Sequence, residues 1–286
     1  MNKINIVAEI GWNWMDDMGL AKRMIKEASQ NGATYVKTQV FDEKYLKPGP
    51  WDEDGRREIY KKAQPTYDQL VEMKQYCKEC GVKFLASCMS VRDAELYAKV
   101  TTEAIKIPGF ESRNKKMLEF AFDNFDTIIM STGTSSVKEI VDILSTFKKN
   151  EYKKLVLLHC VSAYPCLPEY ANLERINEFK LFFALNFPSL SMEERNKKVG
   201  YSDHIQGVES AKVALEYDIG WIEKHFTIDR SLPGRDNKFA ILPEELKNLT
   251  DYIQLREKMK INLGDNFLEC EKEVRKIQPG RFAIDE

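Results

Sequence analysis

The sequence predicts an α/β protein of the (β/α)8 TIM-barrel class. Eight short runs rich in apolar and β-branched residues alternate with eight segments of helical periodicity. Strict alternation implies parallel strands joined by right-handed crossovers, and eight such units are the number that closes a barrel. The length of 286 residues suits one barrel, for which roughly 250 residues is typical. We therefore expect a single TIM-barrel catalytic domain over residues 1–286.

Each predicted strand is a short run in which apolar residues dominate. The first, residues 4–11, reads INIVAEIG, and the second, residues 33–41, reads ATYVKTQVF. The other six cover residues 83–89, 103–108, 127–131, 154–161, 198–203 and 220–226. Nearly continuous apolar runs are typical of parallel strands that are buried on both faces.

Each predicted helix is a segment whose apolar residues recur at helical spacing. These segments cover residues 17–31, 67–80, 90–99, 114–123, 136–148, 173–178, 207–216 and 243–260. Two stretches interrupt the alternation: residues 42–65 are expected to form a long polar loop, and the form of residues 179–197 stays open. An open doubly wound sheet is the alternative architecture, but the sequence lacks the glycine-rich loops of the common nucleotide-binding folds.

The composition excludes several classes of protein. A formal net charge of −2, from 43 basic and 45 acidic residues, argues against a polybasic binder of nucleic acid or membranes. No apolar run approaches the roughly 18 residues that span a bilayer, and Glu9 interrupts the short apolar N-terminus, so no signal peptide is expected. Six cysteines are few for this length, which fits a reducing compartment, and the expected location is the cytoplasm.

Polar side chains gather where the predicted strands end, and the active sites of TIM barrels lie at that face. A buried strand should be almost entirely apolar, so these residues indicate a site rather than a core. They are Glu9, Lys37, Gln39, Ser87, Lys106, Ser131, Ser202 and Glu223, with Glu111, Tyr164 and Asp236 in the loops that follow. Residues two apart on a strand share a face, as Lys37 and Gln39 do.

All three histidines of the chain lie at predicted strand ends, at positions 159, 204 and 225. His204 and His225 end consecutive strands at equivalent height, so their imidazoles could share one divalent cation. Two histidines leave coordination positions for water, substrate and one carboxylate, which suits an open catalytic site. The candidates for that carboxylate are Asp203, Glu223 and Asp236. His159 is expected in the wall of the site.

Lys37 and Lys106 are expected to project into the barrel mouth as two cations without counterions, which would be costly there. An anionic substrate would stabilise them, and the hydroxyl groups of Ser87, Ser131 and Ser202 could donate to its phosphate or carboxylate oxygens. Two alternatives are a Schiff-base lysine and a pair of structural lysine–glutamate ion pairs. A metal together with two lysines favours a metal-assisted condensation over the imine route.

These motifs resemble those of the sialic acid synthase family, whose members make nonulosonic acids such as N-acetylneuraminic, legionaminic and pseudaminic acids. The resemblance covers about residues 4–245. It is carried, in order, by AEIGWN (8–13), VKTQVF (36–41), IKIPGFES (105–112), MSTG (130–133), LLHCVSAYP (157–165), GYSDH (200–204), EKHFT (223–227) and RSLPGRD (230–236).

The resemblance implies a transferase of carbohydrate biosynthesis that condenses phosphoenolpyruvate with the open-chain aldehyde of a 2-acetamido sugar and releases phosphate. It implies a divalent metal on His204 and His225, typically Mn²⁺, with Mg²⁺ and Co²⁺ as the alternatives. Phosphoenolpyruvate would contact Lys37, Ser87, Lys106, Ser131 and Ser202, and the sugar would contact Gln39, Tyr164 and Asp236. Glu111 would take the proton of the attacking water and Glu9 would orient that water, although these two roles could be exchanged.

The sequence also departs from the family. Gly109 stands where a serine is common in the phosphate pocket, and the chain ends at Glu286, where the linker to a small antifreeze-like domain would begin. We therefore expect a barrel without that domain, and the sugar stays unnamed. The alternatives are a non-catalytic or regulatory barrel and a related 3-deoxy-sugar-acid synthase with another aldose acceptor. A homodimer through the apolar stretch 182–187, or packing of that stretch on the barrel, is open.

Overall fold

The computed structural model describes residues 4–279 and 281, and the other residues of the predicted domain, 1–3, 280 and 282–286, lie outside the described part. Eight described strands pair in parallel, each with its sequence neighbour, and β1 pairs with β8 to close the barrel. The strands are β1 (Asn5–Gly11), β2 (Tyr35–Val40), β3 (Lys83–Cys88), β4 (Ala104–Ile107), β5 (Thr127–Ser131), β6 (Leu155–Cys160), β7 (Val199–Asp203) and β8 (Trp221–His225). The predicted (β/α)8 barrel is confirmed.

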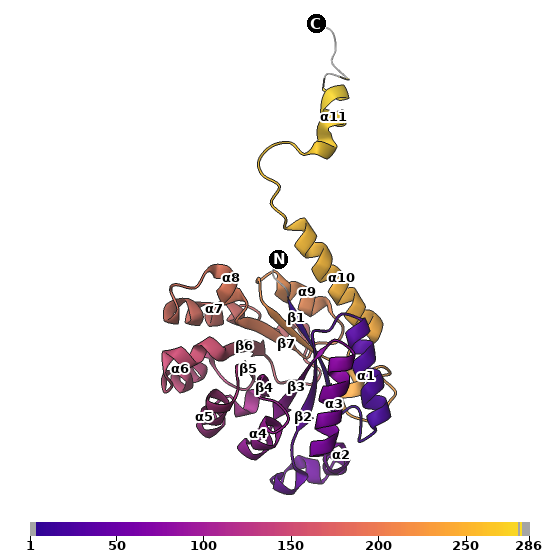
Figure 1. Ribbon diagram of the computed structural model, residues 1–286, viewed down its shortest axis with the longest axis vertical. Coiled ribbons are helices and arrows are strands. Elements are labelled where there is room, and N and C mark those ends of the chain that lie inside the picture. Colours follow the sequence, from indigo (N-terminus) through magenta and orange to yellow (C-terminus); the bar gives the residue numbers. More distant parts are fainter. Residues whose placement is uncertain (1–3, 280, 282–286) are drawn as a thin grey trace.

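The helices that alternate with the strands lie around the outside of the barrel (Figure 1). They are α1 (Met18–Gln30), α3 (Tyr67–Glu79), α4 (Val91–Ala98), α5 (Lys115–Asn124), α6 (Val137–Ser145), α7 (Arg175–Asn186), α9 (Glu209–Leu215) and α10 (Pro243–Met259). The first is representative, because Asp17 caps its N-terminus by accepting from the backbone N–H of Leu20. Its buried side is the apolar stripe that the periodicity predicts.

The two stretches that interrupt the alternation are more ordered than a simple loop. Residues 42–65 contain two 3-10 turns and helix α2 (Arg56–Ala63), so the prediction of a plain polar loop is wrong there. Helix α7 runs to Asn186 because Phe179, Phe182 and Phe183 are buried beneath it, and α8 (Met192–Asn196) follows. The buried phenylalanines answer the open question about the form of residues 179–197: these three side chains pack on the barrel, whereas Leu181, Leu185 and Met192 of the same stretch are exposed.

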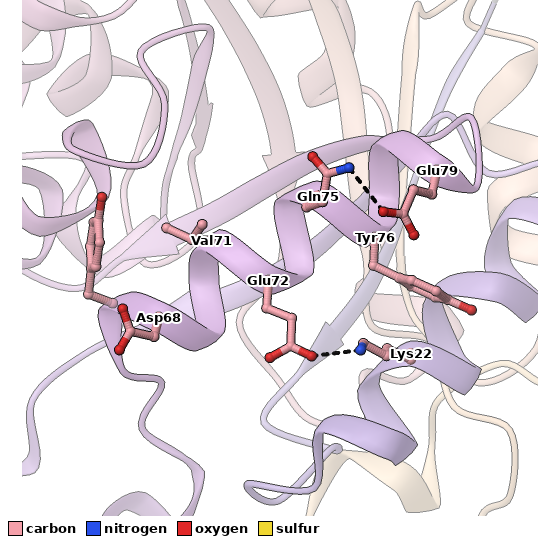
Figure 2. A pocket seen from close by; sticks show the side chains of 8 residues that line it. Lys22, Asp68, Val71, Glu72, Gln75, Tyr76 and Glu79 are labelled. Carbon is pink, nitrogen blue, oxygen red and sulfur yellow. Dashed lines mark hydrogen bonds and ion pairs between the residues drawn. The ribbon is translucent and has the colours of Figure 1, made fainter.

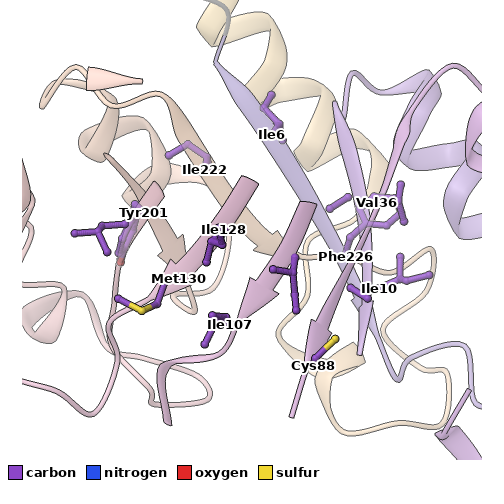
Figure 3. Close-up of a cluster of buried hydrophobic side chains, with 14 of the residues drawn as sticks. Ile6, Ile10, Val36, Cys88, Ile107, Ile128, Met130, Tyr201, Ile222 and Phe226 are labelled. Carbon is purple, nitrogen blue, oxygen red and sulfur yellow. The ribbon is translucent and has the colours of Figure 1, made fainter. Parts of the chain in front are cut away.

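The core has two parts, divided by the barrel wall. Outward-facing strand residues pack under the helices, and Figure 3 shows several of them, among them Ile10, Val36 and Ile128. A separate cluster fills the barrel interior. It consists of Val7, Tyr35, Leu85, Ala104, Ile129, Val156, Leu158 and Trp221. This interior layer forms the floor on which the next inward residues of the strands stand.

After α10 the chain leaves the barrel, and helix α11 (Lys272–Ile277) stands apart from it (Figure 1). Several apolar side chains of this segment are exposed, including Phe267, Val274 and Ile277. In the part of the chain that the structure describes, no helix combines the length and apolarity needed to cross a bilayer.

Candidate active site

One ring of inward-facing side chains lies directly above the interior core, and each strand contributes one member. Period-two alternation places seven of them two residues after an interior core position, and Ser202 follows Gly200 in the same way. The ring consists of Glu9, Lys37, Ser87, Lys106, Ser131, Cys160, Ser202 and Glu223. These residues line a cavity of about 760 Å³, and all twelve predicted site residues line the same cavity. The sequence patterns therefore identified one contiguous site.

The two buried lysines are neutralised by two buried glutamates. Lys37 Nζ lies 2.5 Å from Glu9 Oε2, its direct register partner across β1 and β2, and it donates to Ser87 Oγ at 2.6 Å. Lys106 Nζ donates to both carboxylate oxygens of Glu223 at 2.8 and 2.9 Å. The expectation of uncompensated cations is wrong, because a lysine buried in a barrel requires a carboxylate partner.

Glu223 is the residue of this cluster that the sequence reasoning undervalued. It joins the two lysines, since it also lies 3.8 Å from Lys37 Nζ and accepts from Ser202 Oγ at 2.9 Å. Burial opposes its charged form, but Lys106 and Lys37 outweigh burial and lower the pKa of Glu223 to about 2. Burial lowers the pKa of Lys106, although Glu223 acts against it. The alternation Trp221, Glu223, His225 was the signal that could have assigned Glu223 to the ring.

Ser131 supplies an unused hydrogen-bonding group beside this cluster. Its side chain is buried, lines the cavity and has no hydrogen-bond partner among the described residues. Nearby, Gly109 packs so tightly that a Cβ there would lie 2.8 Å from the carbonyl oxygen of Gly133. Any larger residue at position 109 would thus displace the β4 or β5 loop, which is a physical reason for the glycine at this departure from the family pattern.

The histidines at the ends of β7 and β8 face each other. Their ring centroids are 5.4 Å apart, and the Nδ1 of His204 lies 2.8 Å from the carbonyl oxygen of Val161. A carbonyl only accepts, so Nδ1 carries the proton and Nε2 has a free lone pair. The Nδ1 of His225 is buried and has no hydrogen-bond partner in the described part of the chain. Two imidazole donors fit a divalent cation whose remaining ligands are substrate or water, and no described group of three or more His, Cys, Asp or Glu side chains forms a complete metal site.

Asp236 is the carboxylate nearest to the histidine pair. Its Oδ2 lies 3.3 Å from His225 Nδ1 and accepts from Trp12 Nε1 at 2.5 Å. Burial raises the pKa of Asp236, but His225 and Trp12 outweigh burial and the pKa is lowered. Asp203 faces away from the cavity and pairs with Lys224 at 3.0 Å. Of the three candidate carboxylates, Asp236 therefore stands beside the pair, whereas Glu223 is held by the lysines.

His159 does not line the cavity, so its expected place in the site wall is wrong. It alternates with the inward residues of β6 and points outward, where its ring stacks 5.6 Å from that of Tyr201. Its Nε2 lies 2.7 Å from the carbonyl oxygen of Ala171. Burial lowers the pKa of His159 to about 4, which indicates a neutral structural histidine.

The other predicted residues lie around the ring. Gln39 Nε2 donates to Glu9 Oε1 at 2.9 Å, so β1 and β2 are linked at the mouth. Glu111 lies in the 3-10 turn Gly109–Glu111, where its carboxylate accepts from Asn114 at 2.6 Å. Tyr164 is exposed at the mouth, with its ring 4.2 Å from that of His204.

The stretch 42–65 covers one side of the cavity. Arg57 fixes it by pairing with both Glu43 and Asp52. The ring of Tyr60 lies 4.7 Å from Trp12. Four residues that the sequence reasoning missed line this side: Trp12, Arg56, Tyr60 and Arg235. Loop residues carry no periodicity, so the pattern could not identify them.

A second hollow, of about 450 Å³, lies on the outer surface between α1 and α3 (Figure 2). Lys22 pairs there with Glu72 at 2.6 Å, and Gln75 donates to Glu79 at 2.9 Å. None of its lining residues is buried, and none belongs to the predicted site. The barrel-mouth cavity is therefore the candidate active site.

Comparisons with known proteins agree with the motifs. A model described as the NeuB family matches residues 24–264. The N,N'-diacetyllegionaminic acid synthase of Campylobacter jejuni is 30% identical over 289 residues, which cover 96% of this chain and 82% of the relative. The N-acetylneuraminate-9-phosphate synthase of Drosophila melanogaster is 29% identical over 265 residues, 88% of this chain and 68% of the relative.

A solved structure is similar over the whole barrel. The N-acetylneuraminic acid synthetase of Leptospira borgpetersenii superposes with a TM-score of 0.79 at 28% identity, covering 99% of this chain and 94% of that one. These three relatives are named as synthases of legionaminic acid, of N-acetylneuraminate 9-phosphate and of N-acetylneuraminic acid. The family model matches most of the chain, so this protein belongs to the NeuB family, the sialic acid synthase family that its motifs resemble.

Proposed function

We propose that the protein condenses phosphoenolpyruvate with the open-chain form of a 2-acetamido sugar, giving a nonulosonic acid and phosphate. The observation that carries this proposal is the pairing of a lysine- and serine-lined pocket with two facing histidines in a single cavity. The first suits a small dianionic or trianionic substrate, and the second suits a carbonyl that must be polarised. Membership of a family of synthases supplies the reaction class.

The lysine end of the cavity would bind phosphoenolpyruvate. Lys37 and Lys106 would direct charge-assisted hydrogen bonds at phosphate and carboxylate oxygens, and the unpartnered Ser131 hydroxyl would add a neutral donor. Because Glu9 and Glu223 already neutralise the lysines, the anion would have to loosen these pairs on binding. The pairs would then keep the empty pocket from carrying two uncompensated buried charges.

The histidine end would bind the aldehyde group. His204 and His225 would hold a divalent cation, Mn²⁺ by expectation, which supplies Lewis-acid polarisation of a carbonyl oxygen. Tyr164 and Asp236 lie beside these histidines and, with Gln39 of the same cavity, would contact the sugar. The aromatic wall of Trp12 and Tyr60 would limit its size.

The reaction would proceed by attack of carbon 3 of phosphoenolpyruvate on the aldehyde carbon, forming the new carbon–carbon bond. The aldehyde oxygen becomes a hydroxyl after protonation, and positive charge develops at carbon 2. Water adds to carbon 2 and gives a proton to a base. The carbon–oxygen bond to phosphate then breaks while the hydroxyl at carbon 2 gives up its proton, which passes to the departing phosphate, and a keto acid and inorganic phosphate are left.

Glu111 is the proposed base for this water, and Glu9 would orient it. Glu111 is half-buried at the mouth and is held by only one neighbouring amide, Asn114. Glu9 is held by Lys37 and Gln39 and is therefore better suited to a fixed, ionised role. Exchange of the two roles would appear as a loss of water addition in the Glu9 variant alone.

Phosphate release from phosphoenolpyruvate, assayed with Mn²⁺ and a panel of N-acetylated hexosamines, tests the proposal. We expect aldose-dependent release that His225→Ala abolishes while the thermal unfolding temperature stays close to that of the parent. No consumption of phosphoenolpyruvate with any aldose by the metal-loaded protein would refute the proposed function. Binding of phosphoenolpyruvate in a calorimeter without turnover would instead favour the non-catalytic alternative.

A further inference from the structure

Asp236 is buried between two donors that come from opposite ends of the barrel sequence. The indole N–H of Trp12 donates to its Oδ2 at 2.5 Å, and His225 Nδ1 lies 3.3 Å from the same oxygen. Trp12, His225 and Asp236 are 6%, 7% and 6% exposed. Water therefore has little access to the carboxylate, and the two neighbours determine its orientation.

The chain fixes both sides of this contact. Trp12 stands in the turn after β1, where its carbonyl accepts from the backbone N–H of Met15, and its ring packs against Tyr60. Asp236 begins a 3-10 turn, and its own carbonyl accepts from the N–H groups of Phe239 and Ala240. The carboxylate thus points at His225 because its backbone and its indole partner are both anchored.

We propose that Trp12 and Asp236 are positioning residues for His225 and act as a relay that sets which imidazole nitrogen faces the cavity. A carboxylate only accepts, so donation across the 3.3 Å from His225 Nδ1 to Asp236 Oδ2 would place the proton on Nδ1 and leave the lone pair on Nε2. His204 has the same arrangement, with Nδ1 bound to the carbonyl of Val161. Both histidines then present Nε2 to the cavity.

This inference rests on the proposed function, because it takes His225 as a metal ligand, and it gives Asp236 a role toward that histidine in addition to its proposed contact with the sugar. Carboxylate–histidine–metal chains orient the imidazole and raise its basicity, and loss of such an outer partner typically weakens metal binding about 10- to 100-fold. Trp12 would act one step further out, by holding Asp236 against His225. The Nδ1 of His225 is buried and makes no hydrogen bond among the described residues, and Asp236 Oδ2 lies 3.3 Å from it, so this carboxylate is the acceptor available to it.

The test is a Mn²⁺ titration followed by electron paramagnetic resonance, in the parent and in Trp12→Phe, Asp236→Asn and Trp14→Phe variants. Trp12→Phe keeps an aromatic ring but loses the N–H, and we expect it and Asp236→Asn to weaken Mn²⁺ binding about 10- to 100-fold. Trp14→Phe is the matched control, because it removes an indole N–H in the same turn that donates to the carbonyl oxygen of Gly11, and Trp14 does not line the cavity. Its Mn²⁺ affinity should stay within about twofold of the parent, against that 10- to 100-fold loss.

The outcomes separate this inference from the proposed function. Parent protein that binds no Mn²⁺ would refute the proposed metal site itself. If Trp12→Phe and Asp236→Asn both bind Mn²⁺ as tightly as the parent, the relay is overturned. If Asp236→Asn raises only the KM for the aldose, Asp236 acts on the sugar alone. Thermal unfolding of each variant identifies a folding defect, and Asp236→Asn decides the matter if Trp12→Phe does not fold.

Discussion

Replacing Glu223 with glutamine removes the carboxylate that joins both buried lysines. Glu223 is 4% exposed and accepts from Lys106 at 2.8 and 2.9 Å and from Ser202 at 2.9 Å. Removing one partner of a buried ion pair costs about 3–5 kcal/mol, because the other charge is left uncompensated. We expect the free energy of unfolding at pH 7 to fall by this amount.

The pH dependence of the loss follows from the pKa directions. The pKa of Glu223 is lowered from 4.5 to about 2, so its stabilising contribution is complete above pH 4.5 and is lost as the pH falls toward 2. Burial lowers the pKa of Lys106, and Glu223→Gln removes its main opposing partner. In this variant the charged form of Lys106 destabilises the fold, and this destabilisation disappears as the pH rises toward 10.5 and Lys106 loses its proton. The difference in the free energy of unfolding between parent and variant should be largest between pH 4.5 and the pH at which Lys106 loses its proton.

Urea unfolding followed by tryptophan fluorescence measures this difference across the pH range. The double variant Glu223→Gln with Lys106→Met removes both charges and is expected to lose less stability than the sum of the single variants. Residues in contact typically couple by about 0.5–3 kcal/mol. A loss below about 1 kcal/mol, the range of exposed pairs, with no coupling to Lys106 would refute the neutralised-lysine cluster.

Three further perturbations test other parts of the structure. Burial lowers the pKa of His159 to about 4, so the parent should lose free energy of unfolding as the pH falls from 6.5 to 4 and the buried imidazole becomes charged. His159→Gln should lose less over this range. The same dependence of the unfolding free energy on pH in both proteins, measured by urea titration at each pH, would contradict this. Gly109→Ala should cost about 1–3 kcal/mol by overpacking, since its Cβ would lie 2.8 Å from Gly133 O, and an unchanged melting temperature would be the contrary result. Arg57→Met should speed amide hydrogen exchange in residues 42–65 and leave exchange in the strands unchanged, because Arg57 pairs with both Glu43 and Asp52 there. An equal increase in the strands and in residues 42–65 would contradict the view that this stretch is held in place locally.

The architecture and the inward residues could be predicted because strand periodicity is a local property. Ser202 and His204 share a face, as do Glu223 and His225, and the structure places all four in one cavity. Two residues of separation fix that result whatever the rest of the chain does. The histidine pair was therefore readable from the sequence.

Features that depend on contacts between distant segments could not be read in the same way. The pairing of Lys37 with Glu9 depends on the register of β1 and β2, which no single strand specifies. The contact of Trp12 with Tyr60 joins two loops. Helix α7 was predicted too short because its apolar residues are not confined to one face, so Phe182 and Phe183 gave no clear helical stripe.

Mass spectrometry of the reaction in ¹⁸O-labelled water tests the central claim most directly. Phosphoenolpyruvate, N-acetylmannosamine and Mn²⁺ are incubated with the protein, and both products are analysed. The proposed reaction predicts an acid that carries the carbons of both substrates, together with phosphate free of ¹⁸O, because water attacks carbon 2 and the carbon–oxygen bond breaks. Pyruvate with labelled phosphate, and no condensed acid, would contradict it.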